Sequence, residues 1–216
     1  MTKKHTINIM RNEILGGSKE IWDIYSQILK IVNLNPKEKI LDAGCGEGLL
    51  MNHFQGENVK GIDLNPENIK KAMTKGYKEV LEGDLTKLPF KNGEFDKTIC
   101  MEVVQFVDNQ RKMFQELLRV TKKEIILTSP NHNFSSIRTL FKLGRSNFIK
   151  GLQDKKHFFV NQYLFERLAN ENDLKLEMKY LSRSFGFIRN LRFLGNLLAG
   201  EIVGIFLVKE PKEQIK

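Results

Sequence analysis

Residues 40–48 read Ile40-Leu41-Asp42-Ala43-Gly44-Cys45-Gly46-Glu47-Gly48, and this stretch decides the fold. Its apolar start is typical of a short buried strand, and its alternate glycines lead into apolar residues spaced as in a helix. Glycine is needed where the main chain turns sharply or lets a ligand approach, because a Cβ atom would clash there. The stretch therefore predicts a strand, a turn and a helix, which form either an ordinary connection or a site for a ligand lying against the main chain.

The acid at the end of this strand narrows the class of ligand. A dinucleotide-binding turn has the pattern G-x-G-x-x-G and brings a pyrophosphate to a helix N-terminus, where Asp42 would repel it. In this chain Gly48 comes one residue early, and Leu49 stands where the third glycine should be. No Lys-Ser/Thr pair follows, so a phosphate-binding P-loop is excluded. An acid at this point suits a ligand with positive charge.

Two more acids follow predicted strands. Asp63 ends a strand over 58–63 and lies 21 residues after Asp42. This separation is close to the roughly 20 residues that place an acid on a ribose in nucleotide-binding units. Asn65 and Pro66 then predict the start of a helix through Met73. A third strand over 78–83 leads directly into Asp84. For Asp63, a structural role in a turn or cap is the competing interpretation.

Four motifs in order resemble those of the class I S-adenosylmethionine (SAM) dependent methyltransferases. They are D-x-G-C-G-x-G at 42–48, Asp63, Asp84-Leu85, and L-P-F-x-x-x-x-F-D at 88–96, which leads into a strand over 97–101. The last motif is similar to that of the small-molecule branch often labelled type 11. The resemblance covers residues 40–131 and implies a cofactor that carries a sulfonium and an ammonium group.

The resemblance also implies which residues contact SAM. Asp42 and the glycine turn would hold its amino-acid end, Asp63 its ribose, and Asp84 with the Leu85 main chain its adenine. The reaction would be an in-line displacement in which a substrate nucleophile attacks the sulfonium methyl, and it would gain mainly from alignment and desolvation. The expected cofactor-binding residues are Asp42, Gly44, Cys45, Gly46, Gly48, Asp63, Leu64, Asp84, Leu85 and Met101.

No catalytic residue can be assigned from the resemblance. The family often has an E-H-like pair after the fourth strand, and this chain has Gln105 and Phe106 there, so no acid or base role is carried over. Glu102 is an acid near the strand end, with a helix cap as the equal alternative. His132 and His157 are candidates by position alone, and a surface or structural histidine is the competing interpretation for each.

The order of patterns predicts one α/β domain. We expect a Rossmann-like, seven-stranded, mostly parallel sheet with helices on both faces, closed by an antiparallel hairpin of strands over 175–181 and 202–208. Further helices are expected over 18–32, 108–120 and 161–172, and a strand over 124–129. Within the single domain (1–216) we distinguish an arm and helix (1–35), a SAM-binding core (36–131), a basic and aromatic insertion (132–160), a helix and hairpin (161–209) and a tail (210–216).

Composition agrees with a cytoplasmic protein. The chain has 216 residues, of which 41% are hydrophobic and 28% charged, as in soluble globular proteins. Its start leads into no long apolar run, so no signal peptide is expected. The apolar tract 194–208 is interrupted by Glu201 and glycines and is too short and too polar to span a bilayer. Cys45 and Cys100 form no disulfide or metal-binding pattern, which favours a reducing compartment.

Basic residues concentrate in the second half of the chain. Residues 132–216 contain 15 Lys and Arg against 8 Asp and Glu, whereas the whole chain carries a formal charge of +9. Segment 132–156 has six bases and one acid among eight large apolar residues, and 183–192 repeats the mixture. We expect these two stretches to form a lid for a small acceptor with an apolar body and an anionic group. Contact with anionic membrane lipids and a plain solvated surface are the alternatives.

Three other functions compete with a small-molecule methyltransferase. A NAD-dependent oxidoreductase would share the layout, but Asp42 and the glycine spacing argue against it. A SAM-binding regulator without catalysis would fit the missing histidine. Nucleic-acid methylation is favoured by basicity but not expected, because the D/N-P-P-Y/F motif and the nucleophilic cysteine after a proline are missing from the corresponding places. The paired-glutamate loop of the protein-arginine branch is missing too, which argues against a protein substrate.

Overall fold

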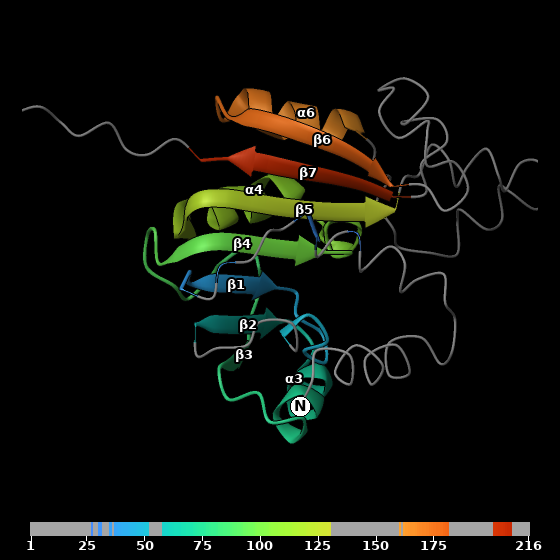
Figure 1. The fold of residues 1–216 in the computed structure, drawn as a ribbon. Coiled ribbons are helices and arrows are strands. Elements are labelled where there is room, and N and C mark those ends of the chain that lie inside the picture. Colours follow the sequence, from blue (N-terminus) through green and yellow to red (C-terminus); the bar gives the residue numbers. More distant parts are fainter. Residues whose placement is uncertain are drawn as a thin grey trace, which may run out of the picture.

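The core of the protein is one seven-stranded sheet in the order β3-β2-β1-β4-β5-β7-β6 (Figure 1). The computed structural model describes residues 27, 30–31, 35, 37–51, 58–130, 160, 162–181 and 201–208. Within them only β7 runs against the other strands, since it pairs antiparallel with both β5 and β6. This confirms the predicted, mostly parallel sheet and its final hairpin. The strands are β1 (Ile40–Ala43), β2 (Val59–Asp63), β3 (Val80–Glu82), β4 (Phe95–Met101), β5 (Thr121–Pro130), β6 (Lys175–Leu181) and β7 (Glu201–Leu207).

Helices cover both faces of the sheet, as expected. α4 (Gln110–Val120) and α6 (Gln162–Glu171) pack on one face through apolar residues that include Phe114 and Phe165. α3 (Pro66–Thr74) packs on the other face through Ile69 and Ala72. A short 3₁₀ helix, η2 (Val104–Phe106), follows β4. The sheet is therefore buried on both sides, which explains why apolar residues fill the middle of its central strands, as at Ile99 and Cys100 of β4 and Ile125–Leu127 of β5.

The core on the α4 and α6 face is centred on Phe206 of β7. Its ring lies 4.7 Å from that of Phe114 and 5.9 Å from that of Phe165, measured between centroids. Neighbouring residues of β5 face opposite sides, because Ile125 packs in this core and Ile126 in the core of the other face. These contacts fix the register that brings the ends of the strands together.

Element boundaries differ from the sequence prediction by a few residues. β4 begins at Phe95 rather than Lys97, and β5 begins at Thr121 rather than Glu124. Phe95 is buried and pairs with Thr121, so the sheet extends toward its amino end through residues whose charged neighbours had indicated a loop. Asn65 caps α3 by accepting a hydrogen bond from the Glu67 N–H at 3.0 Å, as predicted.

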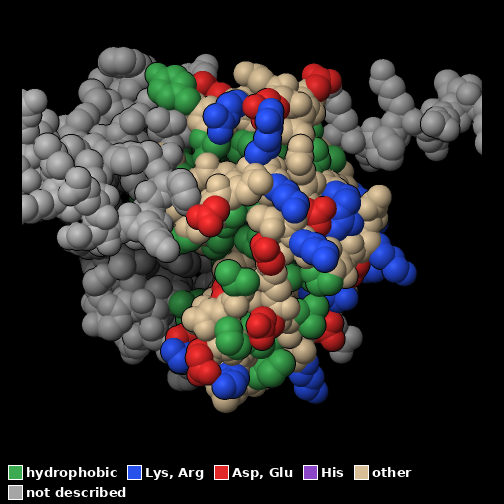
Figure 2. Space-filling view, turned by 180° about the vertical axis from the view of Figure 1, so that it is seen from behind, with side chains coloured by type: hydrophobic (Ala, Val, Ile, Leu, Met, Phe, Trp, Pro, Cys, Tyr) green, Lys and Arg blue, Asp and Glu red, His purple; other side chains and the backbone are tan. Residues whose placement is uncertain are grey.

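Several sequence predictions lie outside the described residues. Of the expected helix over 18–32, only residues 27, 30 and 31 are described, and they are helical. The insertion over 132–156, the connection 183–200 and the tail 210–216 are not described. Seen from the face that carries α4 and α6, basic and acidic side chains of the described part are interspersed (Figure 2). No helix among the described residues is long and apolar enough to cross a membrane.

Candidate functional site

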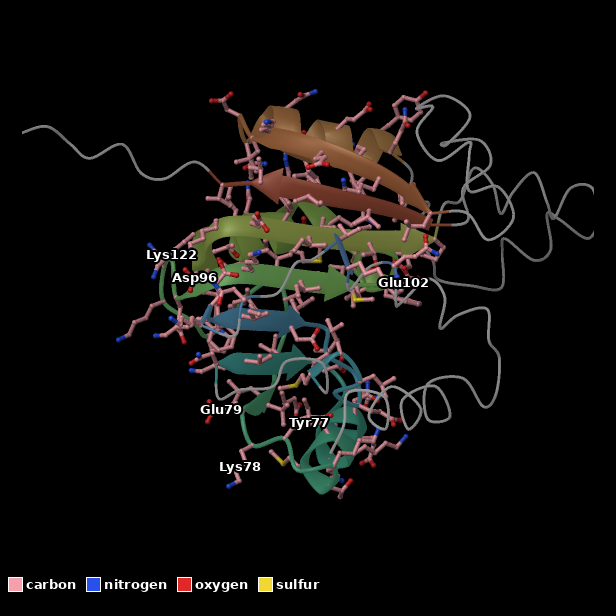
Figure 3. The ribbon with its side chains drawn as sticks, in the orientation of Figure 1. Tyr77, Lys78, Glu79, Asp96, Glu102 and Lys122 are labelled. Atoms are coloured by element: carbon pink, nitrogen blue, oxygen red, sulfur yellow. The ribbon has the colours of Figure 1, made fainter. Side chains whose placement is uncertain are left out.

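The carboxyl ends of β1, β2, β3, β4 and β5 meet along one edge of the sheet, where the candidate site lies. Strand order reverses between β1 and β4, with β2 and β3 on one side and β5 on the other. Open α/β sheets bind ligands outside such a switch point. Asp42, Asp63, Asp84 and Glu102 all lie within or just after these strand ends, and Figure 3 shows Glu102 at this edge. The structure therefore brings four sequence-predicted acids to one end of the sheet.

The turn after β1 is tight and exposes main chain. Gly44 has φ +80°, and a Cβ atom on it would lie 2.3 Å from Val103 Cγ2, so no other residue fits. Gly48 closes the turn by donating its N–H to the Cys45 carbonyl at 2.9 Å. Gly46 also has positive φ, but no atom of another described residue beyond its chain neighbours lies within 4 Å of the place its Cβ would take. A ligand can therefore approach the main chain at Gly46.

The Asp63 carboxylate holds this turn against β2. One of its oxygens accepts the Gly46 N–H at 2.9 Å, and the other accepts the Asn65 N–H at 2.9 Å and the Asn68 side-chain amide at 3.1 Å. A carboxylate offers about four lone-pair sites, so these three bonds leave room for a further donor. Asp63 thus combines a structural role in the turn with the capacity to bind a ligand hydroxyl.

Asp42 is the most perturbed acid of the described site. Its side chain is 2% exposed, and its Oδ2 has no hydrogen-bond partner among the described residues. Burial, followed by the nearby Asp63 carboxylate, raises the pKa of Asp42 to about 7. A buried carboxylate oxygen without a partner is unfavourable unless a ligand supplies a donor or a cation. This arrangement fits a ligand with a positively charged group.

The two thiols of the described chain are not nucleophiles. Cys45 and Cys100 are buried and free. Burial, followed by the charge of Asp42, raises the pKa of both thiols above the ordinary range. Within the described residues no group of three or more His, Cys, Asp or Glu side chains could hold a metal ion. Among the described residues, the acids Asp42, Asp63, Asp84 and Glu102 are therefore the ionisable candidates for binding a ligand at this edge.

The predicted adenine-side residues divide into exposed and buried ones. Asp84 is exposed, and its two oxygens accept from the Thr86 N–H at 2.7 Å and the Thr86 hydroxyl at 2.9 Å. Leu64 is 71% exposed, so its side chain is accessible to a ligand. Leu85 and Met101 have buried side chains in the core, so only their main chains could face a ligand.

Glu102 belongs to a hydrogen-bonded group that the sequence did not reveal. It is not a helix cap, since η2 begins at Val104 and its N-cap residue is Val103. Its N–H donates to Thr128 Oγ1 at 3.2 Å, and the Thr128 hydroxyl donates to Glu102 Oε1 at 3.1 Å. The Gln105 amide donates to the Glu102 carbonyl at 2.9 Å. The signal in the sequence was the pair of polar residues at 128 and 129, at the end of an apolar strand.

The other catalytic candidates, His132 and His157, lie outside the described residues. The structure does describe the strand ends from which the neighbouring undescribed segments continue. Glu201 pairs with Pro130 on one side and with Leu181 on the other. The last residues of β5 and β6 and the first residue of β7 are therefore paired side by side across the sheet. This row of three residues lies at the same edge of the sheet as the acids.

Comparison with known proteins finds a methyltransferase domain model and several relatives that are named as methyltransferases. Residues 41–127 match the family model described as a methyltransferase domain. Norajmaline N-methyltransferase of Rauvolfia serpentina is 30% identical over 65% of this chain, which spans about half (54%) of that protein. Ubiquinone biosynthesis O-methyltransferase of Rickettsia bellii is 28% identical over 82% of this chain and 75% of its own length.

Two further matches are to a protein named for RNA methylation and to a protein whose structure was solved in complex with an activator. The 18S rRNA (guanine(1575)-N(7))-methyltransferase of Saccharomyces cerevisiae is 36% identical over 43% of this chain and 37% of its own length. Among solved structures, one of the complex between the Haloferax volcanii Trm112 methyltransferase activator and a putative methyltransferase matches with a TM-score of 0.69 at 13% identity. It covers 99% of this chain and 100% of that one. At this identity the likeness shows the shared fold.

Proposed function

We propose that this chain, whose residues 41–127 match a methyltransferase domain model, transfers a methyl group from SAM to a small metabolite. The observation that carries the proposal is Asp42, a buried carboxylate whose Oδ2 has no hydrogen-bond partner among the described residues, together with the open space beside Gly46. Such a group suits the positive charge that SAM carries. When bound, SAM supplies a methyl group that its sulfonium already activates.

The residues of this chain would bind the cofactor in three parts. Asp42 and the turn at Gly46 would hold the amino-acid end, since Asp42 offers a carboxylate acceptor and the space beside Gly46 lets a ligand approach the main chain. Asp63 would accept a ribose hydroxyl with its remaining capacity. Asp84 would accept the adenine amino group, and the exposed Leu64 would cover apolar ring surface. Chemically, these contacts align the donor with the acceptor and exclude water, which is where an in-line displacement gains most.

We further propose that the acceptor has an apolar body and an anionic group. Segments 131–159 and 182–200 are both joined to the row of Pro130, Leu181 and Glu201, at the edge that carries the acids. Their sequences combine Arg and Lys with large apolar residues. Long basic side chains can lay their stems along apolar surface and present charge to a ligand. Two of the relatives are named for norajmaline and for ubiquinone biosynthesis, and neither name refers to a nucleic acid or a protein as acceptor.

RNA is the second candidate acceptor. The match to an 18S rRNA methyltransferase and the formal charge of +9 favour it. Binding of RNA through phosphate contacts would weaken steeply with salt. The shorter stretch of similarity to that relative, 43% of this chain, makes the small-metabolite proposal the stronger one.

One experiment separates these candidates. The protein is incubated with methyl-labelled SAM and either a metabolite extract or total RNA, and calorimetry measures SAM binding in parallel. We expect SAM binding and label in the metabolite fraction. Label in RNA would replace the proposed acceptor, whereas lack of SAM binding would overturn the proposed function itself. A variant with Arg138, Lys142 and Arg145 replaced by Gln should raise KM for the acceptor and leave SAM affinity intact.

A further inference from the structure

Glu102 has a backbone conformation that disfavours its own side chain. Its φ is +57°, in the left-handed region that glycine adopts freely and that a residue with a Cβ atom adopts only under strain. Asp173 shares this conformation, but it lies in the turn after α6 and has a short side chain suited to it. Strained residues cluster at functional sites, where the surrounding structure imposes the conformation. The strain at Glu102 therefore indicates a functional role for its side chain.

Buried polar groups impose this conformation. Thr128 is fully buried, and its hydroxyl bonds both the N–H and the carboxylate of Glu102. Gln105, which is 3% exposed, holds the Glu102 carbonyl and accepts a hydrogen bond from the buried Ser129 hydroxyl at 3.3 Å. Buried polar groups are retained where each member has a partner. β5 and η2 thus fix the main chain and one carboxylate oxygen of Glu102.

Glu102 lies on the side of the switch point opposite to the proposed ribose and adenine residues. Val103, its neighbour, packs against Gly44, so the segment after β4 borders the glycine turn. Asp63 and Asp84 lie across that turn, at the ends of β2 and β3. A ligand seated on the turn therefore has its cofactor-binding acids on one side and the fixed Glu102 carboxylate on the other.

We propose that the Glu102 carboxylate binds the hydrogen-bearing nitrogen or oxygen of the methyl acceptor and receives its proton. This inference rests on the proposed methyltransferase function. As the acceptor atom forms its bond to the methyl carbon, the carbon–sulfur bond breaks and its electron pair stays on sulfur. The acceptor's proton passes to Glu102 and then to water, so atoms and charge balance. Thr128 is a positioning residue that aims the carboxylate.

The chemistry of the acceptor follows from this role. A carboxylate binds donors, so the reacting group is an amine or a hydroxyl rather than a carboxylate. The anionic group of the proposed acceptor then belongs to a part of the molecule away from the reacting atom. Glu102 therefore determines which end of the acceptor faces the methyl donor.

The test uses two cofactor analogues and needs no identified acceptor. In both analogues of SAM, a nitrogen atom replaces the sulfonium and a two- or three-carbon arm replaces the methyl group. The arm of the ammonium analogue ends in an ammonium group, and the arm of the carboxylate analogue ends in a carboxylate. We expect the wild-type protein to bind the ammonium analogue at least tenfold more tightly, and Glu102→Gln to reduce this preference to less than threefold. Affinity for SAM should change less than twofold.

Matched variants separate charge, position and folding. Glu79→Gln makes the same charge change at an exposed residue just before β3, away from this edge (Figure 3), and should keep the tenfold preference. Thr128→Val should lower the preference and Thr128→Ser should restore it, which a merely structural role would not predict. Glu102→Gly removes the side chain where glycine is conformationally favoured, so it should remain folded and lose the preference.

Each outcome is decisive. Equal preference in wild type and Glu102→Gln, or a wild type that binds the carboxylate analogue more tightly, would overturn the role of Glu102 while SAM binding upheld the methyltransferase function. If SAM itself failed to bind, the proposed function would fail first. Loss of preference in Glu79→Gln would assign the effect to overall charge and also overturn the inference.

Discussion

The two ends of the sheet differ in whether their buried charged groups have partners of opposite charge. At the amino end, the nearly buried Lys97 lies 3.4 Å from a carboxylate oxygen of Glu38 and 3.1 Å from one of Glu124. Lys123 lies 3.2 Å from Glu38 and 3.1 Å from Asp96. These ion pairs join the segment before β1 to β4 and β5. The protein therefore compensates the charges at this end with its own residues.

An aspartate at the carboxyl end, Asp42, lacks such compensation, whereas Asp96 at the amino end has it. Although burial raises the pKa of Asp96, the Lys39 N–H and Lys123 hold it below its ordinary value. By contrast, burial and Asp63 together raise the pKa of Asp42 to about 7. Figure 3 shows Asp96 and Glu102 at opposite ends of β4. The difference teaches that the amino end supports stability, while the carboxyl end keeps acid groups available to a ligand at a cost in stability.

Removing the buried cation at the amino end should give the largest effect. Lys97→Met keeps an apolar stem but leaves Glu38 and Glu124 without this partner, so the free energy of unfolding should fall by about 3 kcal/mol. Urea denaturation measures the loss. Lys122→Met, at an exposed neighbour, should change the stability by less than about 0.5 kcal/mol. Equal losses in both variants would show that the ion pairs at this end are not important for stability.

Asp63→Ala should act at the other end, on binding. Hydrogen bonds to charged groups contribute about 1.5–3 kcal/mol each, so SAM affinity should fall at least tenfold. Titration calorimetry on wild type and variant measures the change. Asp96→Ala is the matched control at the amino end and should leave SAM affinity unchanged. An unchanged affinity in Asp63→Ala would mean that the cofactor lies elsewhere.

The raised pKa of Asp42 predicts a pH dependence of cofactor binding. Below a pKa of about 7 the carboxyl is mostly protonated and neutral, so affinity for a cationic ligand should increase up to about tenfold from pH 6 to pH 8. The unfolded chain loses this proton nearer the ordinary value of 3.8, so the cofactor-free protein should lose stability as pH rises from about 4 to about 7.

The variant Asp42→Asn tests both parts of this prediction. It should bind SAM weakly with no dependence on pH over this range, and it should lack the loss of stability that the wild type shows. Calorimetry and thermal unfolding at several pH values give the two readouts. A wild-type affinity that stays constant from pH 6 to pH 8 would contradict the assignment of Asp42 to the cationic part of the ligand.

The smallest effect is expected at Glu47 in the turn itself. Its carboxylate contacts Lys71 at 2.7 Å and Lys75 at 3.2 Å, and these partners lower the pKa of Glu47. Exposed ion pairs contribute little, and Asp63 also holds the turn. Glu47→Gln should therefore change SAM affinity less than twofold by calorimetry. A loss of more than fivefold would show that charge pairing, not Asp63, fixes the turn.

The fold could be predicted because its signals are local. The strand and turn at 40–48, the cap at Asn65 and the alternation of apolar residues each specify structure within a few positions. The acids at 42, 63 and 84 were also predictable, since strands of one direction bring their ends to one edge. Strand starts were missed at Phe95 and Thr121, where pairing across the sheet outweighs the local charged sequence.

The polar group around Glu102 could not be predicted from the sequence. Thr128 and Gln105 are separated from Glu102 by different distances along the chain, and only the pairing of β4 with β5 brings Thr128 beside Met101. The positive φ of Glu102 likewise depends on these tertiary contacts, because no glycine or asparagine marks it. Side-chain networks across strands depend on register, which apolar periodicity alone does not specify.

The pairing of Leu181 with Glu201 has a consequence for how this protein can diversify. Residues 182–200 connect Leu181, the last residue of β6, to Glu201, the first residue of β7, and these two residues are paired with each other. A segment of different length or composition can therefore be inserted between these points without changing the register of β6 and β7. Exchanging this segment with that of a relative would therefore test, without disturbing the sheet, whether it carries the acceptor preference that we propose for it.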